Sequence, residues 1–237
     1  MPQRVGLLGG TFDPVHLGHL RIAEEAFEEL SLDRVLLIPS AEPPHKAGKA
    51  IAPYEDRWEM LRIAIEGNPR FELSDVERRI PGKSFTVVTL KKLREEMPED
   101  TAFFSLVGLD AFLELDTWWH FRELFSLSTL AVLRRPGFEP RQIGSFLAAK
   151  VSSEYREQPG GLFFRHPSLF PVRSLLSTPL EISSTHIRKL IAENKSIRYL
   201  VLPEVMRYIA RKNLYKECFT GLRSPEEEQD WQNSKVD

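Results

Sequence analysis

The sequence predicts an α/β fold with a doubly wound parallel sheet, helices on both of its faces and a small helical C-terminal part. Short apolar runs of strand length alternate with longer segments of helical periodicity, and several of the runs end at glycine or proline. Alternation of this kind favours a parallel sheet, because each helix carries the chain back to the edge where the next strand begins. A chain of 237 residues is long enough to bury one sizeable core.

The first expected unit is a strand, a helix and a second strand. Residues 5–8 form an apolar run too short for a helix, and Gly9 and Gly10 end it, because glycine permits backbone conformations that other residues avoid. A second strand is expected at residues 34–39, and the two strands of such a unit are parallel. The helix between them is indicated by apolar residues at helical spacing, namely Leu20, Ala23, Phe27 and Leu30.

Further elements continue the alternation after a proline-rich loop at residues 39–53. Strands are expected at residues 71–76, 103–107, 130–133 and 172–176, and helices near residues 58–65, 87–93, 143–151, 184–193 and 203–212. The stretch 139–166 shows no recognisable chemistry, contains a turn with two glycines and is interpreted as structural. We therefore expect one Rossmann-like domain over residues 1–215 and a polar, acidic, disordered tail over residues 216–237.

Composition excludes several classes of protein. The 32 basic and 34 acidic side chains nearly cancel, so nothing indicates broad binding to nucleic acid. The single cysteine, Cys218, excludes an internal disulfide framework, and no run of about 20 apolar residues exists for a membrane span. The first apolar run is interrupted by Gly9, Gly10 and Asp13, unlike that of a signal peptide. We expect a cytoplasmic protein that binds neither nucleic acid nor membranes.

The most informative segment, residues 9–19, reads Gly-Gly-Thr-Phe-Asp-Pro-Val-His-Leu-Gly-His and joins the first strand to the first helix. A helix start presents unpaired backbone N–H groups and about half a positive charge, which together attract anions. His16 and His19 fall on the first turn, where both imidazoles can donate hydrogen bonds to a phosphate group. Two solvated or capping histidines are the alternative, and a zinc site is less favoured because spacing places no third ligand. We expect no protein metal site, and we expect Thr11 and Phe12 to bind substrate together with the two glycines.

This segment resembles the signature of the nucleotidylyltransferase superfamily. Its Gly-Thr-Phe-Asp-Pro-Val-His-x-Gly-His form is similar to that of bacterial nicotinate-nucleotide adenylyltransferases, while pantetheine-phosphate adenylyltransferases share a Gly-x-Phe-Asp-Pro start. The resemblance covers about residues 4–215, with an interruption near residues 139–170. It implies transfer of an adenylyl group from ATP, and the later segments have to separate the two kinds of acceptor.

A second segment, residues 181–188, places hydroxyl and basic side chains at an expected helix start, in the order Glu-Ile-Ser-Ser-Thr-His-Ile-Arg. Ser183 or Ser184 is expected to cap the helix. Arg188 lies near the first turn, where the helix dipole disfavours positive charge, so an anion such as triphosphate would balance it. The alternative is a solvated arginine that points away. In the resembling family an Ile-Ser-Ser-Thr-x-Ile-Arg segment binds the triphosphate, and the complete match here implies that Ser183, Ser184 and Thr185 bind substrate.

Other loops are candidates for binding the acceptor. In the Pro-Pro-His-Lys loop the prolines restrict the backbone, so Lys46 would lose little entropy on binding; a mobile surface lysine is an equal alternative. Asp110 follows an expected strand and is predicted either to accept hydrogen bonds from ribose hydroxyls or to cap the next helix. The family resemblance implies that His45 and Lys46 lie near phosphate or acceptor, and it adds Arg135 as a further contact.

Trp118 and Trp119 are adjacent, and neighbouring side chains on a regular helix or strand cannot both enter one core. One ring is therefore expected to be available to a ligand, and stacking on a pyridinium ring would add a cation–π term of about 0.5 to 2 kcal/mol. Core packing is the alternative. The resemblance favours Trp118 for stacking and Thr86 as a nearby polar contact. The family often has tyrosine where this chain has Phe85, so that hydroxyl contact has no counterpart here.

The resemblance implies a complete reaction. The 5′-phosphate of nicotinate mononucleotide attacks the α-phosphorus of ATP, giving deamido-NAD and pyrophosphate, and the anionic nucleophile needs no general base. The expected catalytic residues are His16, His19, Lys46 and Arg188, with Mg²⁺ bound through the ATP phosphates. Two alternatives remain, a different phosphate acceptor such as pantetheine phosphate and a nucleotide-binding sensor without catalytic activity. The expected partners are ATP and nicotinate mononucleotide, and the sequence leaves a homo-oligomer open.

Overall fold

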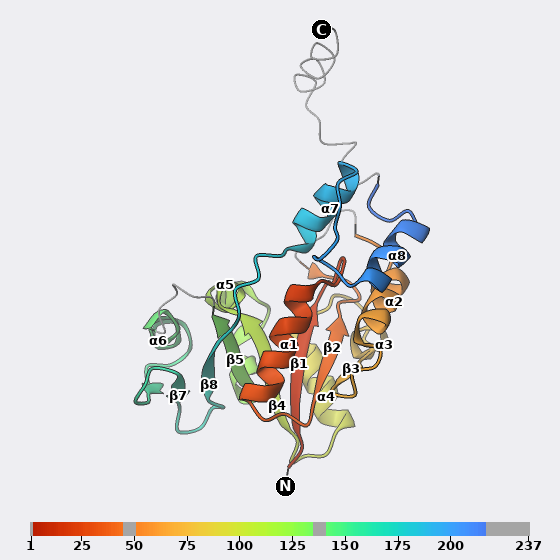
Figure 1. Cartoon of the computed structure of the whole chain (residues 1–237). Helices are drawn as coiled ribbons and strands as arrows, with labels where there is room; N and C mark the ends of the chain where they lie inside the picture. The colour runs from red at the N-terminus through yellow and green to blue at the C-terminus, as the bar shows by residue number, and fades with distance from the viewer. Residues whose placement is uncertain (1, 45–50, 135–140, 217–237) are drawn as a thin grey trace.

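The computed structural model describes residues 2–44, 51–134 and 141–216, and in these the expected α/β fold is confirmed. One sheet has the strand order β3-β2-β1-β4-β5-β8-β7-β6 (Figure 1). Its strands are β1 (Arg4–Gly10), β2 (Arg34–Pro39), β3 (Phe71–Leu73), β4 (Ala102–Gly108), β5 (Thr129–Arg134), β6 (Arg156–Glu157), β7 (Phe163–Arg165) and β8 (Val172–Leu176). Neighbouring strands from β3 to β8 are parallel, and β7 and β6 extend the sheet in the antiparallel direction. Of the tail expected at residues 216–237, all but the first residue lie outside the described residues.

Helices cover both faces of the sheet (Figure 1). The α-helices are α1 (Leu17–Glu29), α2 (Tyr54–Ile65), α3 (Val76–Arg79), α4 (Thr86–Glu96), α5 (Leu109–Leu113), α6 (Arg141–Phe146), α7 (Ser184–Ala192) and α8 (Pro203–Arg211); shorter 3₁₀ or π segments are η2 (Leu115–Thr117), η3 (Phe121–Ser126) and η4 (Leu147–Val151). Side chains of β2 alternate between the two hydrophobic clusters that result. Val35 and Leu37 join the cluster that includes α1, whereas Leu36 and Ile38 join the cluster that includes α4. Within the described ranges, no helix is both long enough and apolar enough to cross a membrane.

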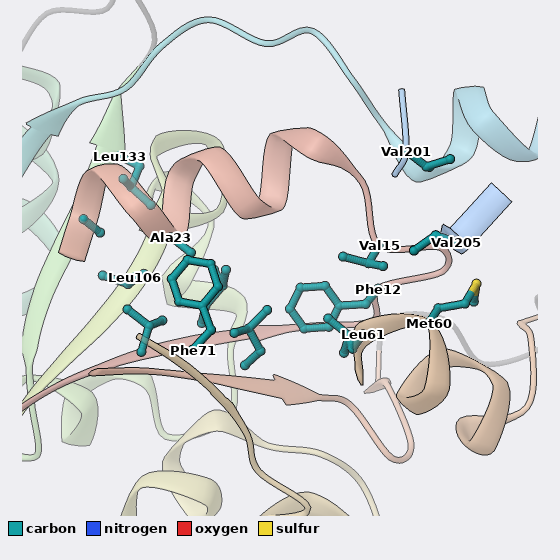
Figure 2. Packing of buried hydrophobic residues seen from close by; sticks show 14 of the residues in the cluster. Phe12, Val15, Ala23, Met60, Leu61, Phe71, Leu106, Leu133, Val201 and Val205 are labelled. Carbon is teal, nitrogen blue, oxygen red and sulfur yellow. The ribbon is translucent and has the colours of Figure 1, made fainter. Parts of the chain in front are cut away.

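The cluster on the α1 face extends from the sheet to the C-terminal helices (Figure 2). Ala23 of α1 and Leu106 of β4 belong to it at one end. At the other end Phe12 lies beside Leu61 of α2, near Val205 of α8 (Figure 2). The expected helical C-terminal part is therefore present, and it packs on the same core that supports the first helix.

The strand expected at residues 71–76 is shorter than predicted. It ends at Leu73, and Val76 already begins α3. The Ser74 hydroxyl accepts a hydrogen bond from the Val76 N–H over 3.4 Å. A local bond of this kind offers the backbone an alternative to the sheet ladder, so the apolar pattern overestimated the strand.

The stretch 139–166 contributes more to the sheet than the sequence indicates. Its expected helix is present as α6 and η4, and the expected turn at Gly160 and Gly161 has φ angles of 93° and 70°. This turn joins β6 to β7, which form an antiparallel edge on a sheet expected to be parallel throughout. Strands of two and three residues are too short to show a periodic pattern, so the hairpin could not be found from periodicity.

Candidate active site

A cavity of about 640 Å³ opens beside the carboxyl ends of β1 and β4. The next strand along the chain, β2, pairs with one side of β1 and β4 pairs with the other, so the strand order reverses at this point. Ligands of doubly wound folds bind at such reversals, and the volume suits a small-molecule site. The residues predicted from the sequence that line this cavity are Gly9, Gly10, Thr11, His19, Thr86 and Trp118.

Neither glycine is required for its backbone conformation, and only Gly10 is required for space. Gly9 and Gly10 are strand residues of β1, and neither has a positive φ, so the expected conformational role is wrong. A Cβ added at Gly10 would meet the ring of Phe12 at 3.2 Å, whereas one added at Gly9 would have no neighbour within 4 Å. Gly10 therefore makes room for Phe12, and Gly9 leaves the backbone open to the cavity.

Phe12 lies in the core instead of the cavity. Its φ of 50° turns the chain after β1, and its side chain, only 2% exposed, packs near Met60 and Leu61 (Figure 2). It is not among the residues that line the cavity, so the geometry does not support the predicted substrate contact. Its ring meets the His19 imidazole edge-on, with centroids 4.9 Å apart, and this contact orients the imidazole.

His16 and His19 begin α1 as expected, but their positions are not equivalent. His16 is the N-cap residue, and its backbone N–H donates to His19 Nδ1 over 3.2 Å. Because Nδ1 accepts this bond, a neutral His19 ring carries its hydrogen on Nε2. The two rings stack with centroids 3.6 Å apart and planes inclined by 21°. His19 lines the cavity, while His16 does not.

Burial determines the charge of His16. Its imidazole is enclosed, and the loss of solvation lowers its pKa from 6.5 to about 4. Its Nδ1 has no hydrogen-bond partner among the described residues. The sequence leaves open whether this histidine acts in its protonated form. In the structure His16 is the neutral N-cap residue of α1, and its ring stacks on that of His19.

Arg57 on α2 is a site residue that the sequence does not reveal. The residue is 2% exposed, and its guanidinium donates to the backbone carbonyls of Thr11 (2.8 Å), Ser40 (2.8 Å) and Ala52 (3.0 Å). These carbonyls belong to the loops after β1 and β2 and to the segment before α2. Arg57 therefore fixes one wall of the cavity, although the helical pattern around it is typical of an ordinary surface residue.

The start of α7 meets the loop after β1, so the structure brings together the two segments that the sequence indicates as candidates for phosphate binding. Ser183 caps the helix by accepting a backbone N–H of the first turn over 3.2 Å, and the Ser184 hydroxyl donates to the Pro14 carbonyl over 2.9 Å. Arg188 donates to the Asp13 carbonyl over 2.7 Å and lies 3.5 Å from the Asp13 carboxylate. A buried carboxylate, rather than solvent, balances this arginine.

Several predicted residues do not line the cavity. These are His16, Phe12, Arg188, Ser183, Ser184, Thr185 and Asp110. Thr185 accepts a hydrogen bond from Arg188 over 3.3 Å, and Asp110 is exposed on the first turn of α5. His45, Lys46 and Arg135 lie outside the described residues. Across residues 2–44, 51–134 and 141–216, no three His, Cys, Asp or Glu side chains come together as a metal ion would require.

The adjacent tryptophans differ in exposure, and the more exposed ring is Trp119 rather than Trp118, the residue favoured for stacking. Trp118 is half-buried and packs against the cluster on the α4 side, while Trp119 is 49% exposed. Both line the cavity, and Trp119 packs on Phe85 with ring centroids 4.9 Å apart. Aromatic side chains from two separate segments therefore belong to the lining of the cavity, together with the glycines.

The lining of the cavity that includes the aromatic residues also includes a buried carboxylate. Glu77 on α3 is buried, lines the cavity and accepts a hydrogen bond from the Thr89 hydroxyl over 2.9 Å. Burial raises the pKa of Glu77. No pattern in the sequence indicates a site role for this residue, because a glutamate beside two arginines is typical of a solvated surface.

Comparison with known proteins covers most of the chain. A model of the cytidylyltransferase-like family matches residues 7–190. A probable nicotinate-nucleotide adenylyltransferase from Pelobacter propionicus is 42% identical over 216 residues, covering 91% of this chain and 100% of its own length. A probable nicotinate-nucleotide adenylyltransferase from Trichlorobacter lovleyi is 44% identical over 214 residues, covering 90% of this chain and 100% of its own length.

Solved structures share the fold at lower identity. The Plasmodium falciparum nicotinic acid mononucleotide adenylyltransferase complexed with NaAD aligns with a TM-score of 0.70 at 18% identity, covering 90% of this chain and 97% of that one. The Plasmodium falciparum enzyme complexed with APC aligns with a TM-score of 0.67 at 17% identity, with the same coverage. At these identities the likeness concerns the fold.

Proposed function

Because the chain belongs to the nicotinate-nucleotide adenylyltransferases, within the cytidylyltransferase-like family, we propose that it transfers the adenylyl group of ATP to nicotinate mononucleotide. The products are deamido-NAD and pyrophosphate, so the reaction is a step of NAD biosynthesis. A cytoplasmic setting accords with a chain that has one cysteine.

The observation that supports this proposal best is a single cavity with two unlike walls. One wall is the open backbone at Gly9 with His19 at the start of α1, and the other carries the rings of Trp118 and Trp119. Phosphate oxygens are attracted to the first wall, because a helix start and an imidazole N–H both carry partial positive charge. A pyridinium ring is attracted to the second wall through its contact with aromatic faces. One cavity therefore suits both substrates of the reaction.

The reaction requires the two substrates to be held in position more than it requires a base to activate the acceptor phosphate. An oxygen of the acceptor 5′-phosphate forms a bond to the α-phosphorus of ATP, and the bond from that phosphorus to the bridging oxygen of pyrophosphate breaks. In this scheme His19 donates from Nε2 to a phosphate oxygen and stabilises the charge that develops there. Neutral His16 acts through His19, since its ring stacks on that imidazole and its backbone N–H fixes the tautomer.

The proposed site also includes Mg²⁺ and the side chains of His45, Lys46 and Arg135. Mg²⁺ arrives with ATP as the counter-ion of the triphosphate and neutralises part of its charge. Lys46 and His45 follow the prolines Pro43 and Pro44, which line the cavity, so both histidine and lysine are close in sequence to the site. Arg135 follows the end of β5 and is proposed as an outer contact.

A pyrophosphate-release assay with ATP and a panel of acceptors tests the function. We expect the fastest release with nicotinate mononucleotide, slower release with nicotinamide mononucleotide, and loss of release when EDTA removes Mg²⁺. Release with pantetheine phosphate alone would establish the other adenylyltransferase reaction. Binding of ATP without release from any acceptor would indicate the sensor.

A further inference from the structure

We propose that Tyr215 is a positioning residue for the triphosphate side of the site and that it acts through the buried carboxylate of Asp13. The proposal rests on the proposed function, because it concerns how the two phosphate-binding segments are held together. Tyr215 lies 202 positions from Asp13, and no pattern in the sequence indicates a role for it.

The carboxylate of Asp13 joins segments that are remote in sequence. The residue is 1% exposed, and its Oδ1 accepts hydrogen bonds from the Tyr215 hydroxyl (2.9 Å) and from the Ala52 backbone N–H (3.2 Å). Its Oδ2 lies 3.5 Å from Nη1 of Arg188. The loop after β1, the segment before α2, helix α7 and the end of the described chain therefore meet at one side chain.

The same contacts determine where α7 begins relative to α1. Arg188 donates to the main-chain carbonyl of Asp13 and to the Thr185 hydroxyl, and Ser184 donates to the carbonyl of Pro14. The loop that carries these two carbonyls leads directly into His16, the N-cap of α1. A change in the orientation of the Asp13 carboxylate would therefore move Arg188 and the start of α1 together.

Tyr215 supplies a donor that cannot be replaced by solvent. Its hydroxyl is buried, and a carboxylate that is removed from water needs full hydrogen bonding to remain ionised at low cost. Burial and the neighbouring Asp13 carboxylate raise the pKa of the Tyr215 hydroxyl, so the phenol stays protonated and keeps donating. Without this donor Oδ1 retains only the Ala52 N–H, and the carboxylate is free to turn toward Arg188.

The substitution Tyr215→Phe tests the proposal, because it removes the hydroxyl and leaves the ring. We expect the KM for ATP to rise about 10-fold, with a KM for nicotinate mononucleotide within twofold of the wild-type value and a smaller change in kcat. The dissociation constant of the α,β-methylene analogue of ATP, measured by titration calorimetry, is expected to rise by the same factor. A general loss of structure would change both KM values or neither. A rise in the KM for ATP alone therefore distinguishes a positioning role of Tyr215 from a role in stability.

Tyr208→Phe is the matched control. The Tyr208 hydroxyl donates to Asp56 Oδ1 over 2.7 Å, so this variant also loses a bond between tyrosine and a carboxylate, but at the contact of α8 with α2. We expect its thermal stability to fall while its affinity for the analogue stays unchanged. If Tyr215→Phe binds the analogue as the wild type does, or if Tyr208→Phe weakens binding equally, the proposal is wrong.

A second variant covers the case in which Tyr215→Phe does not fold. Asp13→Asn keeps the size of the side chain but places an amide where Oδ2 faces Arg188, so it is expected to weaken binding of the analogue by a similar factor. Unchanged binding in folded Asp13→Asn would also overturn the proposal. If the wild type binds the analogue but releases no pyrophosphate with nicotinate mononucleotide, the proposed function fails while the comparison of affinities still decides the role of Tyr215.

Discussion

Helices α1 and α7 begin beside the same loop, yet their first turns serve different purposes. At the start of α1, His19 accepts the His16 N–H and lines the cavity. At the start of α7, Ser183 caps the helix in the ordinary way, and Arg188 is bound to Asp13. The start of α1 therefore faces the cavity, whereas the start of α7 holds the loop that leads into α1.

This difference shows that the charge pattern of a helix start does not by itself identify an anion site. A basic residue near the first turn of α7 predicts a bound anion, because the helix dipole disfavours positive charge there. The anion that balances Arg188 in this structure is the carboxylate of Asp13 from the same chain. Binding of triphosphate at the same helix start stays a prediction.

The largest expected effect is that of His19→Ala on turnover. The variant loses the Nε2 donor at the cavity, and kcat should fall by about a hundredfold to ten-thousandfold, the range that positioned acid, base or oxyanion groups contribute. The pyrophosphate-release assay measures this loss, and circular dichroism checks that the protein is folded. His186→Ala, an exposed histidine on the first turn of α7, is the matched control and should retain near wild-type turnover. Near-normal turnover in folded His19→Ala would show that the start of α1, like that of α7, does not take part in the reaction.

Arg188→Ala should mainly reduce stability. The substitution leaves the buried Asp13 carboxylate without its cation, and removal of one partner of a buried ion pair costs about 3 to 5 kcal/mol. Urea unfolding at pH 7 measures the free energy of unfolding. Lys189→Ala is the control, because the exposed Lys189 approaches Glu193 only to 3.8 Å and should contribute less than about 0.5 kcal/mol. A stability loss in Arg188→Ala no larger than in the control would show that the carboxylate does not depend on this arginine.

The free energy of unfolding should depend on pH through His16, the buried histidine at the start of α1. Its folded pKa of about 4 lies below the ordinary 6.5, so the unfolded chain takes up the proton first as the pH falls. The contribution of neutral His16 is complete above pH 6.5 and is lost as the pH falls toward 4, by up to about 3 kcal/mol.

Urea unfolding at pH 7.0 and pH 4.5 measures this loss in the wild type and in His16→Asn. We expect the variant to lose less stability over this interval than the wild type does. His120→Asn, at an exposed histidine, is the control and should lose as much as the wild type. Equal losses in all three proteins would show that His16 is not enclosed as the structure has it.

The elements that the sequence predicted well are those with clear apolar patterns. β2 and β8 were expected at their observed bounds from short apolar runs. α1, α4 and α8 were expected within a few residues of theirs, because burial on one face imposes helical spacing. The site residues Thr11, His19, Thr86 and Trp118 came together because parallel strands end at the same edge of the sheet.

The features that could not be predicted from the sequence depend on contacts between segments that are remote in the chain. Arg57 and Glu77 are charged residues on helices, and only the packing of other elements over them makes them buried. Phe12 was expected in the cavity because its neighbours in sequence are there, but its positive φ turns the ring into the core. The bond of Tyr215 to Asp13 spans almost the whole chain, so no local pattern carries it.

The smallest expected effect is that of Ser183→Ala. The Ser183 side chain accepts a backbone N–H of α7, and loss of such a cap costs about 1 kcal/mol, or a Tm lower by about 2 to 4 °C for a chain of this size. Because this hydroxyl is already used by the helix and does not line the cavity, turnover should change less than about twofold. Differential scanning fluorimetry and the pyrophosphate assay give the two values. A loss of turnover as large as that of His19→Ala, without a change in Tm, would mean that the start of α7 contacts phosphate directly and that both helix starts face the ligand.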